Sequence, residues 1–248
     1  KGLNLAKKLK YDLGVLDGYI ELSNITTNKE IGVKYADSAL QFVRLKPNLY
    51  NIQSKVIAVL YKLGEFSVDN KDYLKAKNFF KQTLDSCYKY KENYIQIHTN
   101  NEISQCYVEL NQPDSARYYL TKNLNNPLFE KNKRVKTRTF QKLGNLEESQ
   151  KNYTKALEYF DKSLSIGKKK SDQYSITQLY KANLLVKLKK YRQAKKALDN
   201  VNYKQISDKF NLAKEYHNLK YLSFSKLNQQ DSTLYHVDKY VTLVDSIY

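Results

Sequence analysis

Few residues in this 248-residue sequence have the types and spacing that catalysis or metal binding requires. The three histidines, His98, His217 and His236, have no second ligand at metal-binding spacing, and no His-Glu-x-x-His motif occurs. Neither a Gly-rich phosphate loop nor a Gly-x-Ser-x-Gly nucleophile motif is present. Acidic neighbours such as Glu147 and Glu148 are typical of an exposed helix. We therefore predict that the protein is not an enzyme, uses no cofactor or metal, and carries its histidines facing solvent or lining a groove.

The two cysteines, Cys87 and Cys106, are expected to lie on consecutive helices. If these helices are antiparallel with a turn near residues 91–93, the two residues are offset by ~14 Å along the helix axis. A disulfide needs Cα atoms within ~7 Å of each other. The sequence therefore predicts two buried free thiols, which leave the cellular compartment undecided.

Any binding site must be positioned by repeated elements, because the sequence is periodic. The same pattern of large, small and aromatic residues occupies 60–84 and 140–164, with a copy midway and looser copies on either side. One small-residue position recurs at steps of 44, 40, 40, 38 and 39 residues, at Gly32, Ala76, Ala116, Ala156, Ala194 and Thr233. Such a steady period predicts a stack of similar units.

Each unit has the pattern of two amphipathic helices. Apolar residues recur every three or four positions over 140–149, a polar turn follows at 150–152, and the pattern resumes from Tyr153. A small residue late in the first helix is expected to lie where the two helices cross, opposite the alanine of the second helix. These small residues are Gly64, Ser104, Gly144 and Ala182.

The combination of Leu-Gly, Tyr, Ala and Phe at these spacings resembles the tetratricopeptide repeat, although Glu147, Lys181 and Lys220 depart from its pattern. The resemblance implies an all-α fold, an α-α superhelix in which about six helix pairs form a TPR-like solenoid. We expect one domain over 1–248, with 1–11 as the tail of an upstream helix. The expected units are roughly 12–45, 55–90, 95–127, 135–168, 173–202 and 210–248.

A second resemblance concerns the C-terminal stretch 235–248, which is similar to the last repeat helix of bacterial membrane-bound signalling proteins. In that group a membrane span and a histidine kinase or helix-turn-helix output follow the repeats. The resemblance implies a sensor or interaction region on the periplasmic or extracytoplasmic side, with a cytoplasmic location as the alternative. The sequence contains no Met, so we expect that it is a fragment of a longer chain.

The net charge of +18 raises nucleic acid or an anionic membrane surface as alternative partners. The cations are mainly lysines spread along the chain, with acidic residues among them. Specific phosphate and base recognition relies more on arginine, of which only five are present. This pattern favours solvated helix faces, and nucleic acid is not the expected partner. Contact with a membrane is expected only through a segment outside this sequence.

Repeat arrays of this kind bind ligands on the face lined by their first helices. Two register positions on that face carry mostly amides, which both donate and accept hydrogen bonds and suit an extended peptide. The candidate ligand-binding residues are Asn101, Gln105, Arg138, Gln141, Asn145, Glu148, Asn183 and Asn218. A clamp for a C-terminal carboxylate is disfavoured, because Gln141 and Leu179 stand where the family's clamp has Lys. The expected partner is a protein or peptide, with a homodimer possible; simple surface polarity and a structural oligomerisation module are the alternatives.

Overall fold

The computed structural model describes residues 1–26, 28–46, 49 and 52–245, and its regular structure over these residues is helical throughout. The helices are α1 (Gly2–Lys8), α2 (Asp12–Ile25), α3 (Lys29–Leu45), α4 (Gln53–Asp69), α5 (Tyr73–Tyr90), α6 (Asn93–Glu109), α7 (Pro113–Leu124), α8 (Pro127–Lys131), α9 (Lys133–Ser149), α10 (Tyr153–Ile166), α11 (Asp172–Lys187), α12 (Tyr191–Asp199), the 3-10 turn η1 (Tyr203–Gln205), α13 (Phe210–Lys226) and α14 (Gln230–Asp245). The all-α prediction is confirmed. The last residues of the expected helix 235–248, which are 246–248, lie outside the described part.

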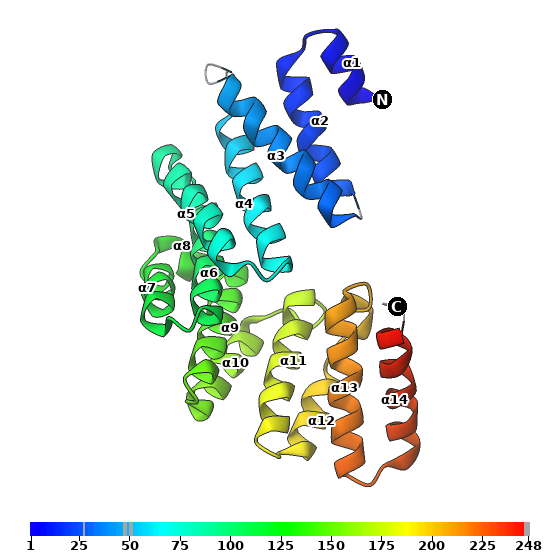
Figure 1. The fold of residues 1–248 in the computed structure, drawn as a ribbon. Helices are drawn as coiled ribbons and strands as arrows, with labels where there is room; N and C mark the ends of the chain where they lie inside the picture. Colours follow the sequence, from blue (N-terminus) through cyan, green and yellow to red (C-terminus); the bar gives the residue numbers. More distant parts are fainter. Residues whose placement is uncertain (27, 47–48, 50–51, 246–248) are drawn as a thin grey trace. The chain divides into compact units, whose positions relative to one another are not determined.

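The helices form two compact units, Lys1–Asn123 (unit 1) and Leu124–Tyr248 (unit 2). Within each unit, successive long helices pack against each other along the chain (Figure 1). The repeat register does not indicate this division, which falls at the end of α7. None of the described helices is both long and apolar enough to cross a membrane.

The two helices of a pair are joined by the same tight turn in five places. In each turn one residue adopts the left-handed conformation, with φ between 54° and 61°, namely Lys71, Asn111, Lys151, Lys189 and Asn228. The next N–H then donates to a carbonyl near the end of the first helix, as from Asn152 to Glu147 at 2.9 Å. This hydrogen bond satisfies a carbonyl that the helix end leaves without a partner. A turn of constant length therefore holds the pairs in the register that the sequence repeats.

The two glycines predicted at the helix crossing, Gly64 and Gly144, each face a buried aromatic ring of the second helix. A Cβ atom on Gly144 would lie 2.4 Å from Cε1 of Phe160, and one on Gly64 would lie 2.5 Å from Cε1 of Phe80. Both rings are fully buried. The alanines of the second helices are fully buried as well, at Ala76, Ala116, Ala156 and Ala194. Glycine is thus required because a phenyl ring occupies the space beside it.

The prediction of two buried free thiols is confirmed. Cys87 of α5 and Cys106 of α6 are both buried and unbridged. Burial, with a smaller effect from the charge of Glu92, raises the pKa of the Cys87 thiol to about 11. A thiol of such high pKa is protonated at neutral pH and is a poor nucleophile.

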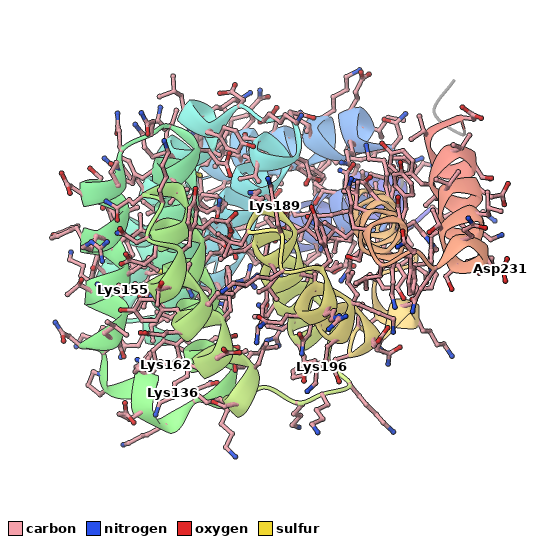
Figure 2. All side chains as sticks on the ribbon, turned by 90° about the horizontal axis from the view of Figure 1, so that it is seen from below. Lys136, Lys155, Lys162, Lys189, Lys196 and Asp231 are labelled. Atoms are coloured by element: carbon pink, nitrogen blue, oxygen red, sulfur yellow. The ribbon has the colours of Figure 1, made fainter. Side chains whose placement is uncertain are left out.

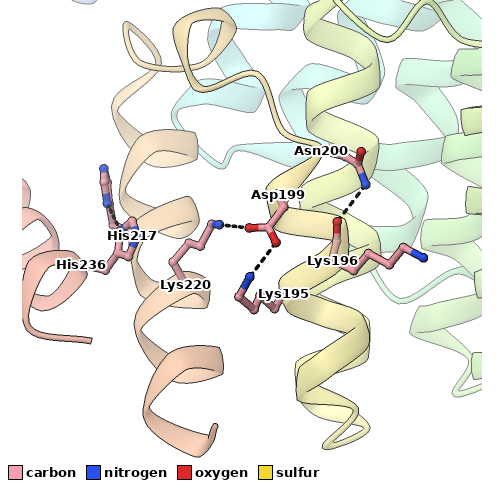
Figure 3. Close-up of polar contacts among 7 residues, drawn as sticks. All are labelled: Lys195, Lys196, Asp199, Asn200, His217, Lys220 and His236. Atoms are coloured by element: carbon pink, nitrogen blue, oxygen red, sulfur yellow. Dashed lines mark hydrogen bonds and ion pairs between the residues drawn. The ribbon is translucent and has the colours of Figure 1, made fainter. Parts of the chain in front are cut away.

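Polar contacts join α12, α13 and α14 in unit 2 (Figure 3). Asp199 of α12 accepts hydrogen bonds from Lys195 Nζ at 2.8 Å and from Lys220 Nζ of α13 at 2.5 Å. Burial opposes ionisation of Asp199, but the two lysines more than offset this effect and lower its pKa. The Lys220–Asp199 ion pair therefore ties the second helix of one pair to the first helix of the next.

His217 of α13 and His236 of α14 form a hydrogen-bonded pair, with 2.9 Å between their Nδ1 atoms (Figure 3). His217 is only 4% exposed, so the prediction that it faces solvent or a groove is wrong. The ring of Phe224 stacks on that of His236. Burial lowers the pKa of both histidines, and the charges of His217 and Lys220 help to bring the pKa of His236 to about 4. Lys239 adds to the effect on His217.

We predict that acid destabilises the packing of α14 on α13. Both histidines have a lower pKa in the folded protein than the ordinary value of 6.5, so the unfolded chain binds more protons at acidic pH. Their contribution is fully present above pH 6.5 and is lost as the pH falls toward about 4. Each such proton adds a slope of at most about 1.4 kcal/mol per pH unit.

Urea unfolding of the protein between pH 7.5 and 4 measures this effect. The variant His236→Phe keeps an aromatic ring against Phe224 and removes one titrating group, so its stability should depend less on pH over this interval. Equal slopes in the variant and the wild type would contradict the prediction.

Candidate functional site

The first helices of unit 2 form one continuous layer. Helix α11 contacts both α9 and α13, while α10 and α12 each pack between two successive first helices. We call the side of α9, α11 and α13 that carries Arg138, Asn145, Glu148, Asn183 and Asn218 the first-helix face. All five side chains are half-buried.

Two polar contacts link α9 to α11 across this face. Gln173 Nε2 donates to Gln141 Oε1 at 2.5 Å, and Lys187 Nζ donates to Glu148 Oε1 at 2.6 Å. Gln141 is only 4% exposed as a result. The Gln141 amide therefore links α9 to α11 and is largely inaccessible to a ligand.

Helix α13 is joined to the same network through an amide and a carboxyl group. Asn183 Nδ2 donates to Glu215 Oε1 at 2.8 Å. Burial raises the pKa of Glu215, and the charge of Glu148 acts in the same direction, whereas Asn183 and Lys187 oppose it. Lys187 thus lies close to the carboxyl groups of Glu148 and Glu215 on the neighbouring first helices. This part of the face therefore contains both donors and acceptors of hydrogen bonds.

Asn101 does not lie on an exposed face, and the prediction that it lines a groove is wrong. It is fully buried in unit 1, where its Oδ1 accepts from Asn123 Nδ2 at 2.9 Å. Asn123 also donates to the Ile97 carbonyl and accepts from Asn100 Nδ2. Asn101 therefore belongs to a buried amide network that joins α6 to α7.

The remaining predicted residues divide between the two units. Gln105 is half-buried in unit 1 and donates to Glu109 one turn further along α6, at 2.8 Å. Arg138, Asn145 and Glu148 lie on α9, Asn183 on α11 and Asn218 on α13, all in unit 2. Five of the eight predicted residues are therefore half-buried on the first helices of unit 2, and Gln141 of α9 is buried.

Sequence reasoning missed Gln173, Lys187 and Glu215, which complete this network. Glu215 occupies the register position that Arg138 occupies two repeats earlier, so the sequence repeat itself could have identified it. No comparable signal marks Gln173, because it lies in the first turn of α11. Lys155 and Lys162 of α10 and Lys196 of α12 extend from separate second helices (Figure 2).

Comparisons with known proteins agree with this architecture. Residues 137–168 match the family model described as "Tetratricopeptide repeat". A search of curated proteins found no match to the chain. Many solved structures share the fold, but those compared below are less than 25% identical to this chain.

Three of these structures cover most of the chain. The Rap conjugation gene regulator of the plasmid pLS20, in complex with the Phr* peptide, has a TM-score of 0.70 and 16% identity, over 95% of this chain and 62% of that chain. NprR in complex with its cognate peptide NprX has a TM-score of 0.69 and 16% identity, over 94% and 68%. BtubC from P. vanneervenii has a TM-score of 0.66 and 11% identity, over 90% and 93%. Residues 137–168 thus match one tetratricopeptide repeat, and the shared fold shows that the chain has a helical-repeat solenoid architecture.

Proposed function

We propose that the protein is a peptide-binding scaffold and that the first-helix face of unit 2 takes an extended peptide. The observation that carries the proposal is the mixture of hydrogen-bonding groups on that face, which are half-buried except for the exposed Lys187. Arg138 and Lys187 donate, Glu148 accepts, and Asn145 and Asn218 do both. An extended peptide presents alternating N–H and C=O groups, which such a mixture can satisfy.

The peptide complexes of the pLS20 regulator and of NprR support this proposal, since both proteins share the fold. We place the scaffold in a bacterial signal-transduction or transcription-regulatory protein. A peptide lying across α9, α11 and α13 would compete for the Glu148–Lys187 and Asn183–Glu215 contacts. Loss of these contacts would change the spacing of the first helices, and this change is the signal that the scaffold passes on.

We expect that selection from a random heptapeptide phage library yields peptides that bind the chain, and that Asn145→Ala and Asn218→Ala each weaken binding. Loss of one or two hydrogen bonds to a peptide corresponds to roughly a five- to thirtyfold increase in Kd. Isothermal titration of the selected synthetic peptides measures this effect.

Asn78→Ala is the matched control, because Asn78 is an exposed asparagine on the second helix α5 of unit 1. This variant should bind the selected peptides as the wild type does. Failure to select any peptide, or equal affinity in all three asparagine variants, would count against the first-helix face as the binding site.

A further inference from the structure

Unit 2 contains a pocket of about 350 Å³ between the first turns of α9 and α11 and the loop that joins α10 to α11. Its volume lies at the lower end of the ~300–1,000 Å³ typical of ligand sites. Such a space accommodates one or two residues of a peptide. In the described part of the chain, none of its lining residues belongs to a group of three or more His, Cys, Asp or Glu side chains that could hold a metal ion.

The rim of the pocket is strongly positive. Lys133 and Arg134 come from α9, and Lys168 comes from the loop after α10. The one lining carboxylate, Asp172, accepts from Lys209 Nζ at 3.3 Å and from the backbone N–H of Gln173 at 2.8 Å. Burial opposes ionisation of Asp172, but these two hydrogen bonds and the charges of Lys209 and Arg134 lower its pKa. The Asp172 carboxylate thus already has its own hydrogen-bond partners. The positive charges of Lys133, Arg134 and Lys168 outnumber its negative charge on the rim.

The backbone at the helix ends adds little to anion binding. Asn132 Oδ1 accepts from the N–H groups of Arg134 and Val135, and Ser171 Oγ accepts from that of Tyr174. These caps occupy donors that a helix N-terminus would otherwise offer to an anion. An anion in the pocket would therefore be held by the side chains of Lys133, Arg134 and Lys168.

The inner wall of the pocket is apolar because of Ile166, Gly167 and Thr137. The Thr137 hydroxyl donates to the Lys133 carbonyl at 2.7 Å. The Thr137 methyl group lies on the side of Gly167, since a Cβ atom there would be 3.5 Å from Thr137 Cγ2. A cationic rim above an apolar wall fits an apolar residue that carries a negative charge, and disfavours a neutral or cationic group.

The pocket lies close to residues of α9 that belong to or support the first-helix face. Gln173 lines the pocket and also donates to Gln141 of α9. Arg134 lies one helical turn before Arg138 on α9. We infer that this pocket binds a carboxylate borne by an apolar residue of the captured peptide, with Arg134, Lys133 and Lys168 holding the carboxylate and Ile166 and Gly167 holding the side chain. The inference rests on the proposed peptide-binding function for the identity of the ligand.

The pocket can be tested alone with N-acetyl-leucine, which carries a carboxylate on an apolar residue, and with N-acetyl-leucinamide, which lacks the charge. The probes are titrated into the full chain with 13C-labelled isoleucine methyl groups, and the shift of the Ile166 methyl resonance is followed. We expect N-acetyl-leucine to bind at least about tenfold more tightly than the amide, because hydrogen bonds to a charged group are the stronger ones.

The charge-neutralising double variant Arg134→Gln/Lys168→Gln should weaken N-acetyl-leucine about tenfold or more. Lys169→Gln/Lys170→Gln is the matched control, since these exposed lysines are neighbours of Lys168 that do not line the pocket. Gly167→Leu should block the pocket sterically, and circular dichroism checks that this variant folds. Equal affinity for the amide, or equal weakening by the control, would overturn the inference.

The source of the carboxylate is settled with the phage-selected peptides, compared as free acids, as C-terminal amides and with Glu or Asp replaced by Gln or Asn. A loss on amidation identifies the terminal carboxylate, and a loss on side-chain replacement identifies an acidic residue. If the peptides bind and neither change matters, the pocket inference fails while the proposed function stands. If N-acetyl-leucine binds as expected but no peptide does, the proposed function fails, and with it the assignment of the carboxylate to a captured peptide.

Discussion

Gly144→Ala is expected to destabilise unit 2 by about 2 kcal/mol net. The added methyl group would lie 2.4 Å from Cε1 and 2.6 Å from Cδ1 of Phe160. The Phe160 ring is fully buried and stacks against Tyr180 of α11, so it cannot move aside without disturbing the next pair. Overpacking of this kind costs about 1–3 kcal/mol and occasionally more, against a gain of about 1 kcal/mol in helix propensity.

Urea unfolding compares Gly144→Ala with two other variants. Gly2→Ala in α1 is the control, because a Cβ atom there meets nothing within 4 Å and only the propensity gain remains. The double variant Gly144→Ala/Phe160→Leu relieves the steric overlap and should recover part of the lost stability. A Gly144→Ala protein as stable as the wild type would show that the backbone at this crossing can separate at little cost.

Asn123→Ala is expected to destabilise unit 1 by about 3 kcal/mol. The Asn123 side chain is fully buried and makes three hydrogen bonds, to the Ile97 carbonyl, Asn101 Oδ1 and Asn100 Nδ2, at 2.9–3.0 Å. Alanine removes all three at once. Each buried polar group that loses its partner costs about 1–3 kcal/mol, and the cavity adds to this cost.

Asn78→Ala is again the matched control, since this asparagine is exposed on α5 of the same unit. Its unfolding free energy should change by less than about 0.5 kcal/mol. The double variant Asn100→Ala/Asn123→Ala should cost less than the sum of the single changes, because the two residues share a hydrogen bond. Additive effects would show that the network does not act as a unit.

The repeat register and the helix pairs could be predicted from the sequence because they depend on local spacing. Apolar residues every three or four positions specify a helix, and a turn of fixed length keeps successive pairs in step. Gly64 precedes Phe80 by the same number of residues as Gly144 precedes Phe160. In both units this glycine lies where the two helices of a pair cross. These relations involve residues fewer than twenty positions apart.

The candidate site was predicted less well, because the rotation of each first helix decides which side chains are exposed. The sequence predicts that Asn101 and Gln141, which share a register position, face a ligand. In the structure Asn101 forms a hydrogen bond with Asn123, and Gln141 forms one with Gln173. A helix advances by about 100° per residue, so a small rotation of the helix is enough to move a polar residue from a groove to an interface between helices. Amides satisfy both surroundings equally well, and their residue type does not distinguish them.

The sequence alone thus determined the helical-repeat class, the length of the repeat, the small residues at the crossings and the two unbridged cysteines. Only the tertiary structure decided that His217 meets His236, that Asn101 is buried and that Arg134 and Lys168 share a pocket. Each of these pairings joins side chains on different elements. Their proximity depends on how the elements pack and rotate, which a local pattern of residue types leaves open.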